Sequence, residues 1–168
     1  VGDIKADILF NTYDSINKKV VLIYVTSTGG QAVVGTISGT TITFGSLVYF
    51  NGVNSNVDAI RACFDVNAGK VLLTYRDGAN SSYGTARVGT VSGTSISFGT
   101  AVVFYSGATR NTNCSYDSTS QKNVIAFTEE GGSYRSKALV GTISGTGISF
   151  GSTVTVDTGT NYRGAWPV

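Results

Sequence analysis

The hydrophobic and polar positions of this chain form short β-type runs, and no stretch shows the period of a helix. Three nearly continuous apolar runs stand out, each after a polar turn and before a polar loop: Val20–Tyr24, Val71–Tyr75 and Val124–Phe127. A run of this length is typical of a strand covered on both faces. The alternating apolar and polar residues farther along indicate half-buried strands. The pattern therefore predicts an all-β protein.

The same pattern recurs three times at a nearly fixed spacing. Each copy has the phrase Val-Gly-Thr-Ile/Val-Ser-Gly-Thr, and its first glycines, Gly35, Gly89 and Gly141, are 54 and 52 residues apart. An aromatic-Asp pair precedes each phrase, and an Ile-Thr/Ser-Phe-Gly motif follows it. A fixed period above ~20 residues indicates a repeat architecture. We divide this single repeat domain, 1–168, into repeat 1 (1–52), repeat 2 (53–107) and repeat 3 (108–159), with 160–168 beginning a further unit.

Each repeat is expected to contain four antiparallel strands. In repeat 2 the first strand runs from Val57 to Phe64. The third strand enters a tight Ser-Gly-Thr hairpin, and the fourth ends at a glycine that we expect to form a β-bulge. These glycines are Gly45, Gly99 and Gly151. The aspartates of the aromatic-Asp pairs, Asp14, Asp65 and Asp117, are interpreted as turn formers, because an aspartate can accept hydrogen bonds from the backbone that follows it.

Four-stranded antiparallel units of this length are typical of β-propeller blades. Neighbouring blades cover both faces of each blade, which accounts for the apolar second strands. A ring typically needs ~4–8 blades. We therefore expect either a homo-oligomer, such as a dimer that closes a six-bladed ring, or part of a longer repeat array. The alternative is a β-trefoil or β-prism, since both are threefold within one chain.

Composition excludes several kinds of chemistry. Only 13% of the 168 residues are charged, the net charge is +2, and histidine is absent. Without histidine the chain has no Ser-His-Asp or Cys-His catalytic arrangement and no histidine-bearing zinc site. The arginines are scattered, whereas nucleic-acid binding requires a basic cluster. No apolar stretch reaches the ~18 residues of a membrane span. We expect no enzymatic activity, no metal, no cofactor and no nucleic-acid partner.

Two cysteines, Cys63 and Cys114, lie in apolar strand contexts. Two cysteines do not make a disulfide framework. They are either two buried free thiols or a single bridge between neighbouring repeats, and the sequence leaves both alternatives open.

The longer and more variable loops are expected at one end of the repeats. In a four-stranded meander, the loop between strands two and three lies at the same end as the connection to the next repeat. The connections are expected at 51–56, 106–113 and 158–163, and the other loops at 77–83 and 129–136. Loops on a rigid scaffold commonly carry function. Their planar polar groups and aromatic rings suit sugars, so the predicted ligand-binding residues are Asp77, Asn80, Tyr83, Glu129, Tyr134 and Arg135.

The segments Tyr75–Gly78, Ser81–Ala86 and Val88–Gly99 resemble tandem repeats in virion and tail-fibre-like proteins of marine bacteriophages. All three repeats share this likeness, although repeat 1 departs from it at residues 26–30, where it lacks an acidic residue. The resemblance implies a role in a virion or in surface attachment, and it implies no catalytic residues.

These observations favour a lectin-like, glycan- or receptor-recognising propeller of a viral or cell-surface fibre, located extracellularly or on the virion surface and serving host recognition. The first alternative is a purely structural repeat protein of a fibre, shell or virion. The second is a carbohydrate-active enzyme with paired carboxylates, Asp77 with Glu129 or Glu130, since glycoside cleavage needs two such groups ~5–10 Å apart in one cleft.

Overall fold

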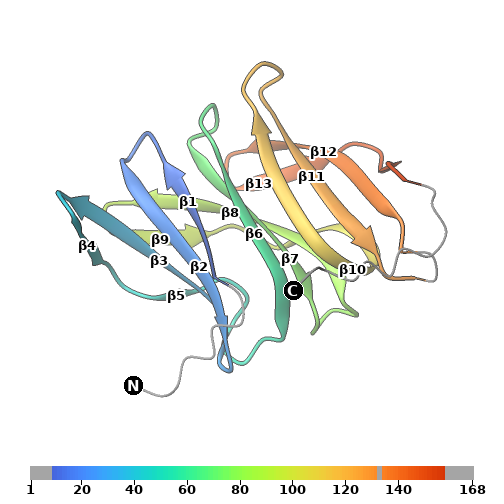
Figure 1. The fold of residues 1–168 in the computed structure, drawn as a ribbon, viewed down its shortest axis with the longest axis horizontal. Helices are drawn as coiled ribbons and strands as arrows, with labels where there is room; N and C mark the ends of the chain where they lie inside the picture. The colour runs from blue at the N-terminus through green and yellow to red at the C-terminus, as the bar shows by residue number, and fades with distance from the viewer. Residues whose placement is uncertain (1–8, 132–133, 158–168) are drawn as a thin grey trace.

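The structure is a computed structural model that describes residues 9–131 and 134–157. These residues form strands, turns and connecting segments without any helix, so no helix among them could cross a membrane. The strands belong to two antiparallel sheets, one of five strands and one of nine (Figure 1). The expectation of an all-β protein is confirmed, and neither sheet closes on itself.

The five-stranded sheet belongs to repeat 1 and the nine-stranded sheet to repeats 2 and 3. Repeat 1 contains β1 (Leu9–Asp14), β2 (Lys19–Thr26), β3 (Gly29–Ser38), β4 (Thr41–Phe44) and β5 (Val48–Tyr49). The larger sheet contains β6 (Val57–Asp65), β7 (Lys70–Asp77), β8 (Tyr83–Ser92), β9 (Ser95–Phe98), β10 (Val102–Asp117), β11 (Lys122–Glu129), β12 (Ser136–Ser144), β13 (Gly147–Phe150) and β14 (Val154–Thr155). β10 joins its two halves, because its first part pairs with β8 and its second with β11.

β10 corrects one expectation from the sequence. The loop predicted at residues 106–113 is wrong, since these residues lie inside this strand. The register shifts against β8 between Val103 and Ala108, and against β11 between Arg110 and Asn113. Bulges of this kind bend a strand without ending it, so polar and glycine residues that resemble a loop continue the sheet.

The fourth strand of each repeat is bent at the predicted glycine. The register of β3 against β4 and then β5 shifts by one residue across Gly45, and repeats 2 and 3 shift in the same way at Gly99 and Gly151. The three glycine N–H groups donate to carbonyl oxygens of Val34, Val88 and Val140 at 2.9, 2.9 and 2.8 Å. The predicted bulges are therefore confirmed.

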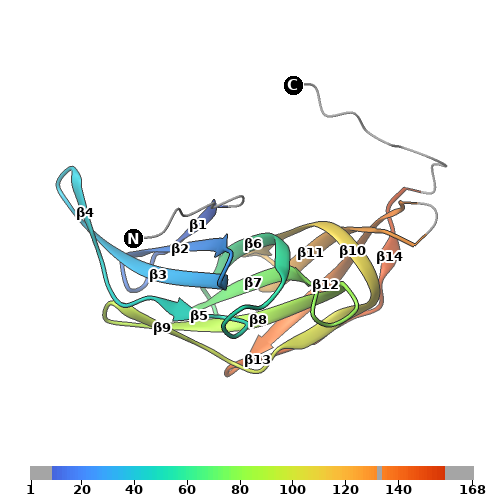
Figure 2. The ribbon, with the colours of Figure 1, turned by 90° about the horizontal axis from the view of Figure 1, so that it is seen from below.

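The hydrophobic core lies between the repeats, and the strands of repeat 2 run between those of repeats 1 and 3 (Figure 2). One cluster joins Val21, Ile23, Ala32, Val34 and Phe50 of repeat 1 to Val71, Leu73, Tyr75, Val91 and Ile96 of repeat 2. The other joins Leu72, Ala86, Val88 and Phe104 of repeat 2 to Ile125, Phe127, Leu139 and Ile148 of repeat 3. Strand β7 therefore faces a core on both sides, as its apolar run predicts.

Repeats 1 and 3 share neither of the two hydrophobic clusters among the described residues. The main packing contacts connect repeat 1 with repeat 2 and repeat 2 with repeat 3. Phe44 on the outer side of repeat 1 is 50% exposed, and Val140 on the outer side of repeat 3 is 45% exposed. A trefoil or prism would bring these two repeats together, and the described residues show no such closure.

The aspartates of the aromatic-Asp pairs form turns, as predicted. The Asp14 carboxylate accepts hydrogen bonds from the backbone N–H groups of Ile16 and Asn17, and Asp65 and Asp117 accept equivalent bonds from the residues that follow them. The Ser120 side chain, and then the backbone N–H groups that follow Asp117, lower the pKa of that carboxyl group.

Cys63 and Cys114 are free thiols, which decides between the two alternatives from the sequence. The Cys63 thiol lies 3.6 Å from Asn123 Oδ1, to which it can donate, and the Cys114 thiol lies 3.7 Å from the Leu72 carbonyl oxygen. A hydrogen bond with Cys114, and then burial, raise the pKa of Cys63. The Cys63 thiol therefore stays protonated at neutral pH.

Candidate functional site

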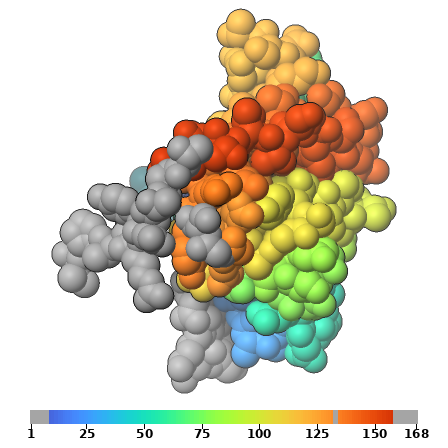
Figure 3. Space-filling view, turned by 90° about the vertical axis from the view of Figure 1, so that its right-hand side faces the viewer, coloured from blue at the N-terminus to red at the C-terminus, as the bar shows by residue number. Residues whose placement is uncertain are grey.

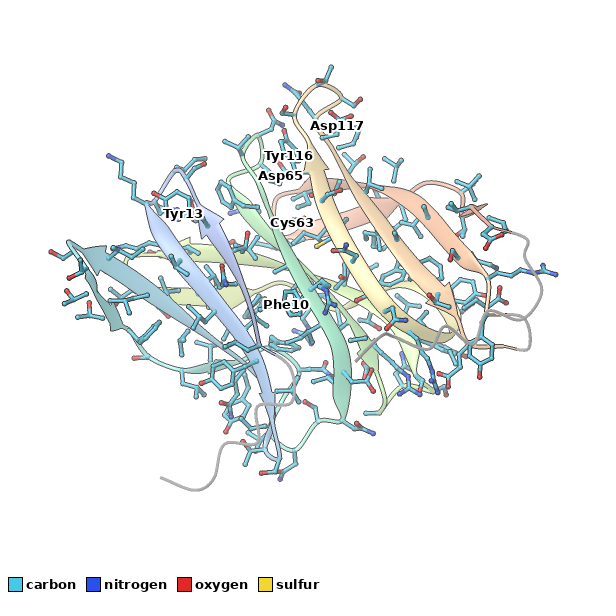
Figure 4. The ribbon with its side chains drawn as sticks, in the orientation of Figure 1. Phe10, Tyr13, Cys63, Asp65, Tyr116 and Asp117 are labelled. Atoms are coloured by element: carbon cyan, nitrogen blue, oxygen red, sulfur yellow. The ribbon has the colours of Figure 1, made fainter. Side chains whose placement is uncertain are left out.

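A pocket of about 670 Å³ lies where β1, β6, β7 and β10 meet. β1 is the first strand of repeat 1, β6 is the first strand of repeat 2, and the second part of β10 is the first strand of repeat 3. The lining residues are Leu9, Phe10, Asp58, Ala59, Arg61, Arg76, Arg110 and Asn111. Phe10 lies between β1 and β6, away from the strand ends where Tyr13, Asp65 and Asp117 lie (Figure 4).

Two β-bulges at equivalent positions build the wall of the pocket. The register of β6 shifts across residues 58–61, and that of β10 across residues 110–113. The second residue of each bulge has a positive φ, 50° at Ala59 and 49° at Asn111. Alanine is strained by about 1–2 kcal/mol in this region, and the Thr112 hydroxyl holds it by donating to the Ala59 carbonyl oxygen. Strained backbone and bulges of this kind cluster at functional sites.

A charged network crosses the pocket from repeat 2 to repeat 3. Arg76 donates from Nη1 to Asp58 Oδ2 at 2.8 Å, and its Nη2 lies 3.3 Å from Glu130 Oε2. The other oxygen of Glu130 pairs with Arg110 Nη2. The hydrogen bond from Arg110 lowers the pKa of Glu130, so this carboxylate is ionised at neutral pH.

The third arginine of the pocket, Arg61, stacks on an aromatic ring. Its guanidinium carbon lies 3.8 Å from the centre of the Phe10 ring, and Nη1 donates to the Ile60 carbonyl oxygen at 2.7 Å. A guanidinium over an aromatic face is held in place by a cation–π interaction. This contact joins repeat 1 to repeat 2 at the edge of the pocket.

The pocket has more positive than negative charge. Three guanidinium groups face two carboxylates, those of Asp58 and Glu130, which leaves an excess of one positive charge. The Arg110 side chain is 53% exposed, and the buried Nε of Arg76 has no hydrogen-bond partner among the described residues. Planar guanidinium groups suit bidentate contacts to carboxylate and sulfate groups. The site can therefore hold an anionic, hydroxyl-rich ligand.

The predicted residues of repeat 2 share one loop, but the Asp77 carboxylate is engaged within it. Asp77 is 8% exposed and accepts hydrogen bonds from Asn51 Nδ2 at 3.3 Å and from the Ala79 N–H at 3.2 Å. The Tyr83 N–H donates to the carbonyl oxygen of Asn80, which is exposed. This loop also contacts the connection before β6, since the Gly78 N–H donates to the Asn56 carbonyl oxygen at 2.8 Å. The expected meeting of these two connections at one end is confirmed.

The predicted residues of repeat 3 do not all lie at the pocket. Glu129 pairs with Lys137 at 2.8 Å, and its N–H donates to the carbonyl oxygen of Arg135, an exposed residue. A hydrogen bond from Lys137, and then one from Tyr105, lower the pKa of Glu129. The Tyr134 ring centre lies 6.0 Å from the Arg110 guanidinium carbon, which places it beside the pocket. Of the two adjacent glutamates, Glu130 is the one that binds the pocket arginines.

Sequence reasoning missed the pocket residues Asp58, Arg61, Arg76 and Arg110. One signal was present, because Asp58 and Arg110 both lie seven residues before the aspartate of their aromatic-Asp pair. This spacing marks equivalent positions of the first strand, whereas the scattered arginines alone indicate no cluster.

In residues 9–131 and 134–157, no group of three or more cysteine, aspartate or glutamate side chains is placed to hold a metal ion. Comparisons with protein-family models, with curated proteins and with solved structures find no match for the chain. The pocket itself is therefore the feature from which a function is inferred.

Proposed function

We propose that the protein is a non-enzymatic binding module that recognises an acidic glycan through the arginine pocket. The observation that carries the proposal is the convergence of Arg61, Arg76 and Arg110, with an excess of one positive charge, on a pocket built from two bulges. Its volume of about 670 Å³ is within the range of small-ligand sites, ~300–1,000 Å³.

The chemistry of the lining fits an acidic sugar better than a neutral one. Uronate carboxylates and sulfate esters accept the paired hydrogen bonds that a guanidinium fork offers. Asp58 and Asn111 supply groups for sugar hydroxyls. Leu9, which is 58% exposed at the rim, offers an apolar contact to the C–H face of a sugar ring.

The scaffold of this site is proposed to be a stack of β-propeller-type blades. Sequential antiparallel strands in each repeat, and cores between the repeats, support this assignment. In a propeller the blades surround a central channel, and β6 packs beside both β1 and β10, as first strands along such a channel would. The resemblance to phage fibre repeats adds a proposed place in a virion or extracellular fibre, where several copies would bind with avidity.

The other two functions are less well supported by the geometry. A glycosidase needs a carboxylic acid with a raised pKa, whereas the pKa values of Glu129 and Glu130 are lowered. A purely structural role agrees with the stacked repeats but gives no reason for a strained alanine beside three arginines.

Replacing Arg110 with alanine is expected to weaken binding of a uronate oligosaccharide by about 10- to 100-fold, because charge-assisted hydrogen bonds to the ligand are lost. Arg110 is partly exposed, so the fold should persist. Isothermal titration calorimetry with an alginate hexasaccharide, a sulfated oligosaccharide and a neutral glucan measures the effect and separates carboxylate from sulfate recognition.

The matched control is Lys18→Ala, which removes one positive charge from the exposed turn between β1 and β2. This turn lies at the end of β1 that is farther from the pocket residues Leu9 and Phe10. This variant should bind within about twofold of the original affinity, since surface charges that far away are screened by salt. Equal losses for the two variants, or equal affinity for the neutral glucan and the uronate, would contradict the proposed site.

A further inference from the structure

The outer faces of repeats 1 and 3 carry the two halves of a contact that the chain already makes twice. A Cβ on Gly45 would lie 1.8 Å from the Thr94 carbonyl oxygen, and a Cβ on Gly99 would lie 2.0 Å from that of Thr146. Gly45 and Gly99 thus each receive the Ser-Gly-Thr turn of the following repeat. At Gly151 the nearest atom is the carbonyl oxygen of Val140, in the same repeat, at 3.7 Å.

The apolar side chains around these turns also pack on the preceding repeat. Phe98 of repeat 2 packs on Phe50 of repeat 1, and Phe150 of repeat 3 packs on Phe104 of repeat 2, with ring centres 6.0 and 6.1 Å apart. Val91 and Ile96 of the second hairpin are buried in the core shared with repeat 1, and Ile148 of the third is buried in the core shared with repeat 2. In the first hairpin, the equivalent residues are exposed: Ile37 at 55%, Ile42 at 42% and Phe44 at 50%.

The face of repeat 3 that would receive a following hairpin also carries exposed apolar residues in the described part of the chain. Figure 3 views the molecule from this side, with repeat 3 in orange to red. Its exposed apolar residues are Val124 at 36%, Val140 at 45% and Val156 at 69%. The residues at these positions in repeat 2, where repeat 3 covers them, are Leu72 at 0%, Val88 at 1% and Phe104 at 7%.

We infer that the outer face of repeat 3 binds the outer face of repeat 1 in a second copy of this chain. The Thr40 turn of that copy would lie on Gly151, and its Phe44 would pack against Val156, as Phe98 packs on Phe50. The contact is heterologous, since it joins two different faces, and it repeats head to tail. A face-to-face dimer would instead pair two identical faces and would not place a turn on a bulge glycine. The association does not depend on the pocket ligand.

Two variants, each with one face disabled, test this arrangement. Phe44→Asp disables the repeat 1 face, and Val140→Asp disables the repeat 3 face; both positions are exposed, so the fold should persist by circular dichroism. In multi-angle light scattering each variant alone is expected to remain at 17.4 kDa. An equimolar mixture is expected to form a complex of twice that mass, because one intact pair of faces remains.

Two further variants check the specificity and register of the contact. Val53→Asp, at a position 62% exposed in the loop before β6, should associate like the wild-type chain. Gly151→Ala should fold normally but associate about tenfold more weakly, because its methyl group overlaps the incoming turn.

Three results would overturn the inference. The first is a wild-type chain that stays monomeric at about 100 μM, well above the ~1 μM dissociation constant of a weak but specific interface. This result is expected if another segment or another protein covers these faces. The second is self-association of Val140→Asp alone, which indicates identical faces. The third is a mixture of the two aspartate variants that remains monomeric.

Discussion

Gly99→Ala is expected to destabilise the protein by about 3 kcal/mol or more, because the added methyl group overlaps the backbone of the next repeat. The Cβ would lie 2.0 Å from the Thr146 carbonyl oxygen. A carbonyl group in a tight turn cannot rotate aside as the end of a long side chain can. Gly45→Ala, with its Cβ 1.8 Å from the Thr94 carbonyl oxygen, should be about as harmful.

The chain contains its own control for this prediction. Gly151 occupies the same bulge position in repeat 3, and its nearest neighbour to a new Cβ is 3.7 Å away. Gly151→Ala should therefore leave the free energy of unfolding unchanged or raise it by up to about 1 kcal/mol, since alanine restricts the unfolded chain. Urea denaturation at about 1 μM protein limits the contribution of association. Equal destabilisation by Gly99→Ala and Gly151→Ala would show that stacking does not explain these glycines.

Asn123→Ala is expected to lower the free energy of unfolding by about 3 kcal/mol, because it leaves one oxygen of a buried carboxylate without a hydrogen-bond donor. Asn123 is fully buried, and its Nδ2 donates at 2.7 Å to Asp65, which is 3% exposed. The bond crosses the contact between repeats 2 and 3. Its loss leaves an oxygen of Asp65 unpaired in the core.

Asn17→Ala removes a similar bond, again to a buried aspartate, but here the donor residue lies at the surface and its truncation opens the carboxylate to water. Asn17 Nδ2 donates at 2.8 Å to the carboxylate of Asp14, but Asn17 is exposed to solvent. Water can replace this donor, so the cost should stay below about 1 kcal/mol. The two variants are compared by urea denaturation, with far-ultraviolet circular dichroism as the probe of unfolding. Similar losses for both would mean that burial between repeats adds little to the bond.

The sequence predicts the strands of this protein well because their signals are local. The run Val71–Tyr75 predicts a strand buried on both faces, and the structure places it in β7 between two cores. Gly93 and its equivalents predict a tight hairpin, and Gly93 has the positive φ, 60°, that such a turn requires.

Alignment of the three repeats also indicates which glycines lie beneath an aromatic ring. Gly30 and Gly84 lie beneath the rings of Phe50 and Phe104, where a Cβ would come within 2.1 and 2.4 Å of ring atoms. The equivalent residues of repeat 3 are Ser136 and Val156. A side chain thus replaces the glycine in the repeat that lacks the ring, where no aromatic ring excludes a Cβ.

The pocket could not be predicted from such signals because it depends on contacts between distant segments. The bulge at Ala59 is held by Thr112 from the next repeat, and Arg76 meets Glu130 only after β7 and β11 have stacked. The segment 106–113 gives the clearest example, since its polar residues predict a loop and the structure forms a bulged strand. Of the six predicted loop residues, all within the described part of the chain, Tyr134 alone has a contact with a pocket arginine there.

The proposed binding site is tested most directly by following the arginine side chains during a titration. The chain has six arginines: Arg61, Arg76, Arg87, Arg110, Arg135 and Arg163. In an arginine Nε–Hε NMR spectrum, adding a uronate oligosaccharide should shift the signals of Arg61, Arg76 and Arg110 and leave that of Arg87 in place. A titration that shifts only Arg135, or that moves no arginine signal at saturating ligand, would contradict the assignment of the pocket as the glycan site.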